Sequence, residues 1–283
     1  MTERLADIGA RIGGVRQLGT VVNAMRGIAA ARAQQARNQL AAVDAYAATI
    51  TGGIGRVLSL SPDRWGDRAE QSGRSILVLF CAEQGFAGAF SERVLDAAGA
   101  AGVSLFLIGT RGLAVAAERG VTPGWSTAMP SHSAGVPKLA DRIAGALYAD
   151  IAAGGPADVD AVFTDWQPGR GRSLQHRRLL PFDPAMFPRH TDRNPPLMNL
   201  APHALLEGLT AEHLHAQLCS AALHAFAAEN EARMEAMAAA RTQIERQLSS
   251  LQAQQRTVRQ EEITAEIIEL AAGEAASRGR ASA

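Results

Sequence analysis

The stretch that decides the fold is residues 234–258, MEAMAAARTQIERQLSSLQAQQRTV. Its apolar side chains recur at steps of three and four residues, and an average period of about 3.5 keeps one stripe of a helix facing a partner helix. The pattern therefore predicts one half of a left-handed coiled coil. The stripe consists of Met234, Met237, Ile244, Leu248, Leu251 and Val258, with Arg241 and Gln255 at its two polar positions.

A related repeat lies near the N-terminus, where the pattern predicts a helix from Thr2 to about Val57, with the first firm break at Ser61–Pro62. Glycines at 52, 53 and 55 weaken the last turns of this helix. Long helices at both ends of one chain are expected to pair with each other. The apolar positions of the N-terminal repeat are Ile8, Ile12, Val15, Val22 and Met25.

Composition argues against several classes of function. Acidic and basic residues balance at 28 each, so no net field draws the chain to nucleic acid or to an anionic membrane. No run of about 18 apolar residues occurs, so we expect no direct insertion into a membrane. Cys81 and Cys219 show no metal-ligand spacing, and we expect buried thiols in a reducing compartment.

The middle of the chain alternates short apolar runs with helical stretches. This alternation is typical of βαβ units around a mainly parallel, twisted sheet, so we expect one α/β domain here. Strands are expected at residues 75–80, 103–108, 159–164 and 175–180, and helices at 90–100, 112–119 and 138–153.

The segment from Pro181 to Pro202 holds six prolines and is expected to be a linker or an extended arm. A helix follows from about Ala204, and its 65 to 70 residues would give about 100 Å of length, too much for a small domain to enclose. We therefore expect an N-terminal coiled-coil helix (1–60), a central α/β domain with the proline-rich linker at its end (61–203) and a C-terminal coiled-coil helix (204–283).

Candidate chemistry in the chain is thin. The turn from Glu83 to Phe90 follows the first expected strand, but it lacks G-x-G-x-x-G and a Walker lysine, and Glu83 would repel phosphate. A structural turn is therefore favoured over nucleotide binding. His213, His215 and His224 lack metal-ligand spacing and are expected to be packed or solvated. We expect no catalytic residue, no metal and no cofactor.

Two polar features leave alternatives open. Arg241 and Gln255 interrupt the C-terminal stripe either because the helix end frays into water or because this segment faces a polar collar of other chains. A small basic cluster in residues 170–178, RGRSLQHRR, is either a solvated loop and strand edge or a contact for an acidic partner.

Four segments resemble one family, the γ subunits of F-type ATP synthases. Residues 229–237, ENEARMEAM, are similar to its E-x-x-A-R-M-x-A-M segment. Arg259–Gln260 and residues 263–273, ITAEIIELAAG, are similar to its R-Q-x-x-I-T-x-E signature. Residues 23–32, NAMRGIAAAR, resemble its K-A-M-x-M-V-A-A-x-K segment, and residues 83–90, EQGFAGAF, fall where it has D-R-G-L-C-G. The resemblance covers the whole chain in order.

This resemblance implies that the terminal helices wind into an antiparallel coiled coil inside a ring of three α and three β subunits. It implies a Rossmann-like α/β domain at the foot of that shaft, with the ε subunit and the membrane-embedded ring of c subunits as further partners. The expected location is peripheral, on the cytoplasmic face of the bacterial inner membrane. Because catalysis in this family occurs on the β subunits, the chain is expected to be a non-catalytic coupling subunit.

The resemblance also implies contact residues for the α/β ring. Met25 and Arg32 are expected on the face of the shaft near the β subunits. Arg259, Gln260 and Thr264 match the segment that meets loops of the β subunits. Departures from the family pattern at Gln255–Arg256 and at residues 83–85 indicate a divergent member, and the coupled ion, proton or sodium, stays open.

Two hypotheses therefore stand. The first is a rotary shaft that couples ion flow to ATP synthesis or hydrolysis. The second is a nucleotide- or small-ligand-binding α/β enzyme with coiled-coil oligomerisation arms. An enzyme requires a pocket in the sheet domain with convergent polar groups, so the surroundings of the sheet distinguish them.

Overall fold

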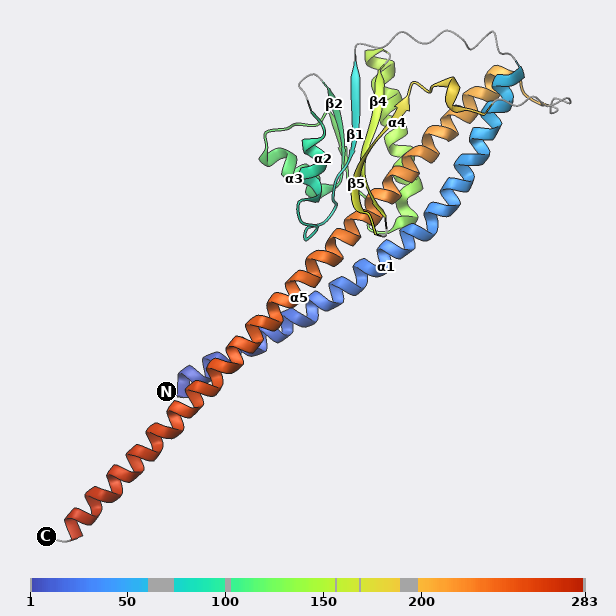
Figure 1. The fold of residues 1–283 in the computed structure, drawn as a ribbon. Coiled ribbons are helices and arrows are strands. Elements are labelled where there is room, and N and C mark those ends of the chain that lie inside the picture. Colours follow the sequence, from blue (N-terminus) through green and yellow to red (C-terminus); the bar gives the residue numbers. More distant parts are fainter. Residues whose placement is uncertain are drawn as a thin grey trace. The chain divides into compact units, whose positions relative to one another are not determined.

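The computed structural model describes residues 2–60, 74–99, 103–155, 157–167, 169–188 and 198–281. The chain forms two compact units, which we call the shaft unit (Met1–Ile28 with Met234–Ala283) and the α/β unit (Ala29–Arg233). Two long helices, α1 (Thr2–Leu60) and α5 (Pro202–Ala281), each contribute residues to both units (Figure 1). The proposed break at Ser61–Pro62 and residues 189–197 of the proline-rich segment lie outside the described residues.

The α/β unit is built on a five-stranded sheet with the order β3-β2-β1-β4-β5. All neighbouring pairs are parallel except β4 and β5, which form an antiparallel hairpin. The order 3-2-1-4 matches the first four positions of the Rossmann order 3-2-1-4-5-6, which confirms the Rossmann-like expectation. The strands are β1 (Ser75–Phe80), β2 (Ser104–Ile108), β3 (Trp125–Thr127), β4 (Asp158–Gln167) and β5 (Gly171–Leu180).

Helices cover both faces of this sheet (Figure 1). On one face α2 and α3 pack against Leu79, Leu107 and Val162. On the other face α4 and the first half of α5 pack against the remaining strand side chains. The shorter helices are α2 (Phe90–Asp96), α3 (Thr110–Glu118), the 3-10 turn η2 (Ser133–Gly135), α4 (Val136–Gly154) and the 3-10 turn η3 (Pro184–Met186).

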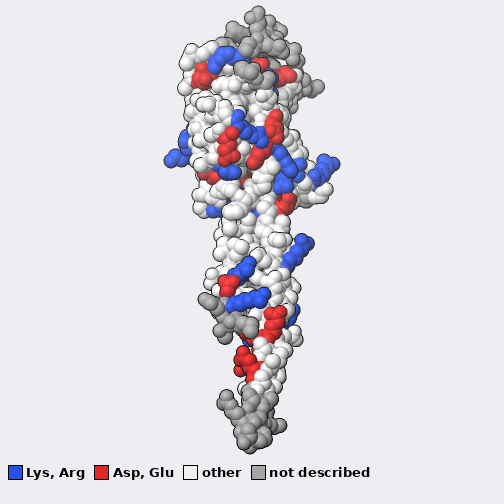
Figure 2. All heavy atoms as spheres, turned by 90° about the vertical axis from the view of Figure 1, so that its left-hand side faces the viewer, with Lys and Arg blue, Asp and Glu red and all other residues white. Residues whose placement is uncertain are grey.

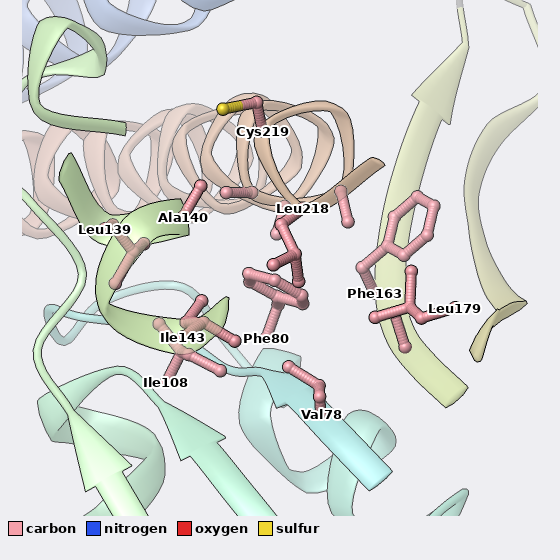
Figure 3. Close-up of a cluster of buried hydrophobic side chains, with 14 of the residues drawn as sticks. Val78, Phe80, Ile108, Leu139, Ala140, Ile143, Phe163, Leu179, Leu218 and Cys219 are labelled. Atoms are coloured by element: carbon pink, nitrogen blue, oxygen red, sulfur yellow. The ribbon is translucent and has the colours of Figure 1, made fainter. Parts of the chain in front are cut away.

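The larger core lies between the sheet, α4 and α5. Phe80 and Val78 of β1 point toward Ile143 of α4 and Leu218 of α5 (Figure 3). These side chains are fully buried, and β1 is covered on both faces, which accounts for its continuous apolar run. Cys219 borders this core and Cys81 borders the other, and both are buried free thiols, as expected.

The structure adds details that the sequence pattern does not carry. The pattern does not predict the three-residue strand β3, because so short a run has no measurable period. β5 begins at Gly171, before the predicted start at residue 175. The sequence pattern misses these first residues because they are polar and lie at the edge of the sheet. The helix α1 continues through its glycines to Leu60, and a β-carbon on Gly55 would lie 2.1 Å from the carbonyl oxygen of Pro188. Gly55 therefore permits close packing rather than ending the helix.

The shaft unit is an antiparallel pair of helices. Ile8 and Ile12 of α1 pack with Leu251 and Val258 of α5. Further along, Val22 packs with Met237 and Ile244. The predicted seam is therefore confirmed, and with it the fold class of paired terminal helices and a central α/β domain.

The polar positions of the seam differ from each other. Arg241 is exposed and pairs with Glu245 one turn further on, at 2.8 Å. Gln255 is half-buried, and its amide nitrogen lies 4.0 Å from the point where a β-carbon on Gly9 would stand. Gln255 thus faces α1 and Arg241 faces solvent.

Candidate functional site

The turn between β1 and α2 is the place where a nucleotide site would be expected in a Rossmann-like sheet. Its first two backbone amides, those of Glu83 and Gln84, instead donate to the carboxylate of Glu229 on α5, at 3.1 and 3.2 Å. An internal carboxylate therefore occupies the amides that a phosphate would use. The helix that follows, α2, is only seven residues long. The geometry does not support the nucleotide-binding hypothesis at this turn.

The side chain of Glu83 is also used internally. It accepts hydrogen bonds from the backbone amide and the hydroxyl of Thr110, at 2.9 and 2.8 Å, and from the amide of Met129 at 2.8 Å. A carboxylate at the first turn of α3 satisfies an amide that the helix leaves free and interacts favourably with the helix dipole. Glu83 is thus a structural acid that joins β1 to α3.

Buried charges on α5 extend this arrangement. Glu229, Glu231 and Arg233 are each at most 7% exposed, in a helix segment that is otherwise rich in alanine. Arg233 binds Glu229 and donates to the carbonyl oxygens of Gln84 and Gly85, at 3.3 and 3.2 Å. The sequence indicates this segment only through the family resemblance. Its one local signal is a Glu–Arg pair four residues apart.

The three histidines on α5 lie in different surroundings. His213 packs against the rings of Phe182 and Phe187, and burial together with the nearby charge of Arg177 lowers its pKa. His215 and His224 contact Asp141 and Asp165, at 3.0 and 2.8 Å. Within the described ranges no three His, Cys, Asp or Glu side chains converge as a metal site.

The basic cluster in residues 170–178 is divided between two environments. Arg177 lies over the ring of Phe163 and donates to Gln217 of α5 at 2.9 Å, so it belongs to the packing of the sheet on that helix. Arg178 pairs with Asp160 at 2.8 Å. On the face shown in Figure 2, acidic and basic side chains are intermixed. Because Arg177 packs on Phe163 and Arg178 pairs with Asp160, the cluster is not one uniform basic patch.

The expected partner-contact residues fall in two places. In the α/β unit, Arg32 is half-buried and lies 3.5 Å from the side-chain oxygen of Gln84. In the shaft unit, Met25 is half-buried beside the Val22 cluster. Arg259, Gln260 and Thr264 are exposed on α5.

Beyond these residues α5 has no helical partner in the described part of the shaft unit. A 3.8 Å ion pair between Arg4 and Glu261 joins the start of α1 to α5, and α5 continues past that point (Figure 1). Four large apolar side chains on this single helix are between 51% and 70% exposed. They are Ile263, Ile267, Ile268 and Leu270, which we call the apolar tip.

A paired-helix shaft with an uncovered apolar tip defines a class of protein, namely a subunit that works inside an assembly. The family model described as ATP synthase matches residues 4–276. The chain therefore belongs to the γ-subunit family of F-type ATP synthases, which confirms the resemblance found in its sequence.

Curated relatives match nearly the full length of the chain. It is 29% identical to the ATP synthase gamma chain of Chlorobium luteolum, over 95% of this chain and 97% of the relative. It is 28% identical to that of Frankia casuarinae, over 96% and 97%. Over the described helices, none is long and apolar enough to cross a membrane.

Solved structures share the fold. A chain from the OSCP/F1/c-ring of the Euglena gracilis mitochondrial ATP synthase matches with a TM-score of 0.68 and 13% identity, over 98% of this chain and 95% of that one. A chain from the central stalk and c-ring of the Tetrahymena thermophila enzyme matches with a TM-score of 0.58 and 14% identity, over 78% and 99%.

Proposed function

We propose that this chain is the central-stalk shaft of an F-type ATP synthase, coupling ion flow through a membrane ring to ATP synthesis or hydrolysis on catalytic β subunits. The observation that carries the proposal is the shaft unit, in which an antiparallel helix pair ends in the apolar tip of α5. Apolar side chains that a free helix leaves in water are expected to be covered by partners. The relatives' name, ATP synthase gamma chain, supports the same role.

In this proposal the chain is not itself catalytic. Three equivalent nucleotide sites differ in affinity only when something asymmetric contacts them differently, and a two-helix shaft is asymmetric. Residues 1–60 and 204–283 supply the two long helices, whose outer parts form the shaft unit, and residues 61–203 complete the α/β unit, which forms its foot. The foot meets the ε subunit and the ring of c subunits, which places the chain peripherally at the cytoplasmic face of the bacterial inner membrane.

The surfaces that meet the α and β subunits are the apolar tip and five further side chains, three on α5 and two on α1. Arg259, Gln260 and Thr264 are exposed just before or within the tip, so they are free to bind loops of the ring. Met25 and Arg32 are half-buried, so each offers one side to a partner.

Truncation after Leu251 tests the proposal, because it removes the apolar tip and leaves most of the seam. The full-length chain is expected to co-purify with α and β subunits. Complexes that carry the truncated chain are expected to hydrolyse ATP without building a membrane potential. Nucleotide turnover by the purified chain alone, or coupling that survives the truncation, would contradict the proposal.

A further inference from the structure

A cluster of buried polar residues lies in the α/β unit where α5 meets the β1–α2 turn. Most of α5 from Leu214 to Ala228 is apolar and packs on the sheet. The helix then buries Glu229, Asn230 and Arg233, at 2% to 5% exposure. Burying charge is costly unless each group finds partners, so these residues need a reason to be there.

The two charged side chains of α5 bind the two kinds of polar backbone group in the turn, its amides and its carbonyls. The carboxylate of Glu229 receives the amides of Glu83 and Gln84, while the guanidinium of Arg233 donates to the carbonyls of Gln84 and Gly85. Arg233 also binds Glu229 itself and the side-chain oxygen of Asn230, the latter at 3.0 Å. The backbone of the turn is thereby bound at both its amides and its carbonyls.

The shape of the turn indicates that these bonds are needed. Phe86, the next residue, has a φ of +62° and is 67% exposed. A bulky residue in the left-handed region is strained, and such strain persists only where the surroundings impose it. Arg233 binds the carbonyl of the preceding residue, Gly85, and supplies such a constraint.

The helix α1 is tied to the same place. Arg37 pairs with Glu231 of α5 and stacks 5.1 Å from the ring of Trp166, and Arg32 contacts the side chain of Gln84. The α/β unit contains α1 only from Ala29 onward and α5 only as far as Arg233. The polar contacts therefore lie on both helices, close to the points where the helices leave this unit.

We propose that Glu229 and Arg233 form a torsional clamp that fixes the rotational phase of α5 relative to the α/β body, so that torque passes between body and shaft without slip. The inference rests on the proposed function as a rotor shaft. Apolar packing is non-directional, whereas hydrogen bonds to a fixed backbone depend on angle. Glu229 and Arg233 are positioning residues in this sense.

The test uses the whole complex in vesicles and measures the ratio of membrane-potential formation to ATP hydrolysis with an oxonol dye, which responds whichever cation moves. Glu229→Gln and Arg233→Met are expected to lower this ratio at least about threefold, with ATP hydrolysis largely retained. The matched controls are Asp96→Asn and Arg119→Met, which break an exposed ion pair elsewhere in the α/β unit. They are expected to leave the ratio unchanged.

A charge swap separates the clamp from an ordinary ion pair. The double variant Glu229→Arg/Arg233→Glu restores a pair of opposite charges four residues apart, but it places a cation against the amides of the turn. It is expected to remain uncoupled. Recovery of coupling in the swap, or an unchanged ratio in the single variants, would overturn the clamp. A wild-type complex that lacks this chain would instead overturn the proposed function.

Hydrogen exchange gives a readout that does not depend on assembly. In the full-length wild-type chain, the amides of Glu83 and Gln84 are expected to exchange at least about a hundredfold more slowly than in an unstructured peptide, although they lie in a turn. In Glu229→Gln this protection is expected to fall, while the amide of Cys81, which donates to Ile108 within the sheet, stays protected. Weaker protection of the two turn amides in the wild-type chain would overturn the inference.

Discussion

The Cγ2 methyl of Ile244 lies 3.4 Å from the point where a β-carbon on Gly19 would stand. Both residues belong to the shaft unit, Gly19 on α1 and Ile244 on α5. The two helices approach closely at this level because one of them carries no side chain there. Gly13, on the same helix, has no atom within 4 Å of its would-be β-carbon, so its surroundings are open.

This difference gives a matched pair of substitutions. Gly19→Leu is expected to force the seam apart and to lower the melting temperature of the full-length chain, since overpacking costs about 1–3 kcal/mol. Gly13→Leu is expected to leave it unchanged or to raise it, because replacing a helical glycine gains roughly 0.5–1 kcal/mol. Thermal unfolding of the two variants, followed by circular dichroism, measures both melting temperatures. Equal shifts would show that the close approach at Gly19 is absent.

Leu251 tests the seam from the other helix. It is 4% exposed and packs with Ile8, Ile12 and Val258. Leu251→Asp buries a charge without a partner and is expected to cost at least about 3 kcal/mol, measured by urea unfolding. The neighbouring exposed residue provides the control, since Ser250→Asp should cost under about 1 kcal/mol. If Leu251→Asp unfolds at the wild-type urea concentration, the seam does not form in the isolated chain.

His213 predicts a pH dependence of stability. Its folded-state pKa lies below the ordinary value of 6.5, so the unfolded chain binds the proton more readily. The free energy of unfolding is therefore fully retained above about pH 6.5 and falls as the pH drops through that value toward the folded pKa. His213→Phe is expected to flatten this loss, because a phenyl ring fills the same aromatic site without titrating. Parallel urea midpoints between about pH 7.5 and 5.5 would contradict the assignment.

The native thiols are expected to be inert. Burial raises the pKa of Cys81 and of Cys219 to about 12, so neither forms the reactive thiolate near neutral pH. Iodoacetamide at about pH 8 should leave both unmodified in the folded chain and alkylate both in urea, as measured by mass spectrometry. An exposed Ser250→Cys should react in the folded state and serves as the positive control. Fast alkylation of either native thiol would show that its site opens.

Much of the fold follows from periodicity. The seam from Met234 to Val258 is predictable because a 3-4 spacing sustained over several heptads is typical of a coiled coil and of few other structures. The parallel strands can be found because both faces of a buried strand are apolar, as in β1. The three residues of β3 are too few to show a period, so the sequence pattern does not reveal that strand.

The contacts of Glu229 and Arg233 with the β1–α2 turn cannot be predicted from the sequence in this way. A Glu and an Arg four residues apart on a helix usually lie on its exposed face, so Glu229 and Arg233 carry no sign of burial in the sequence. Their role depends on the backbone of residues 83–85, about 145 positions earlier in the chain. For Gln255 the sequence pattern suggests a role that the structure does not show. Its place in the apolar stripe allows the interpretation that it faces other subunits, but it lies half-buried opposite Gly9.

Rotation of this chain inside the assembled complex is the most direct test of its proposed role. Both native thiols are buried, so a cysteine introduced at the exposed Lys138 of α4 gives one attachment point for a gold particle. On an immobilised complex supplied with ATP, the particle is expected to turn in one direction, pausing every third of a revolution as three catalytic subunits act in turn. A particle that stays fixed while the same complex hydrolyses ATP would show that the chain is not the shaft.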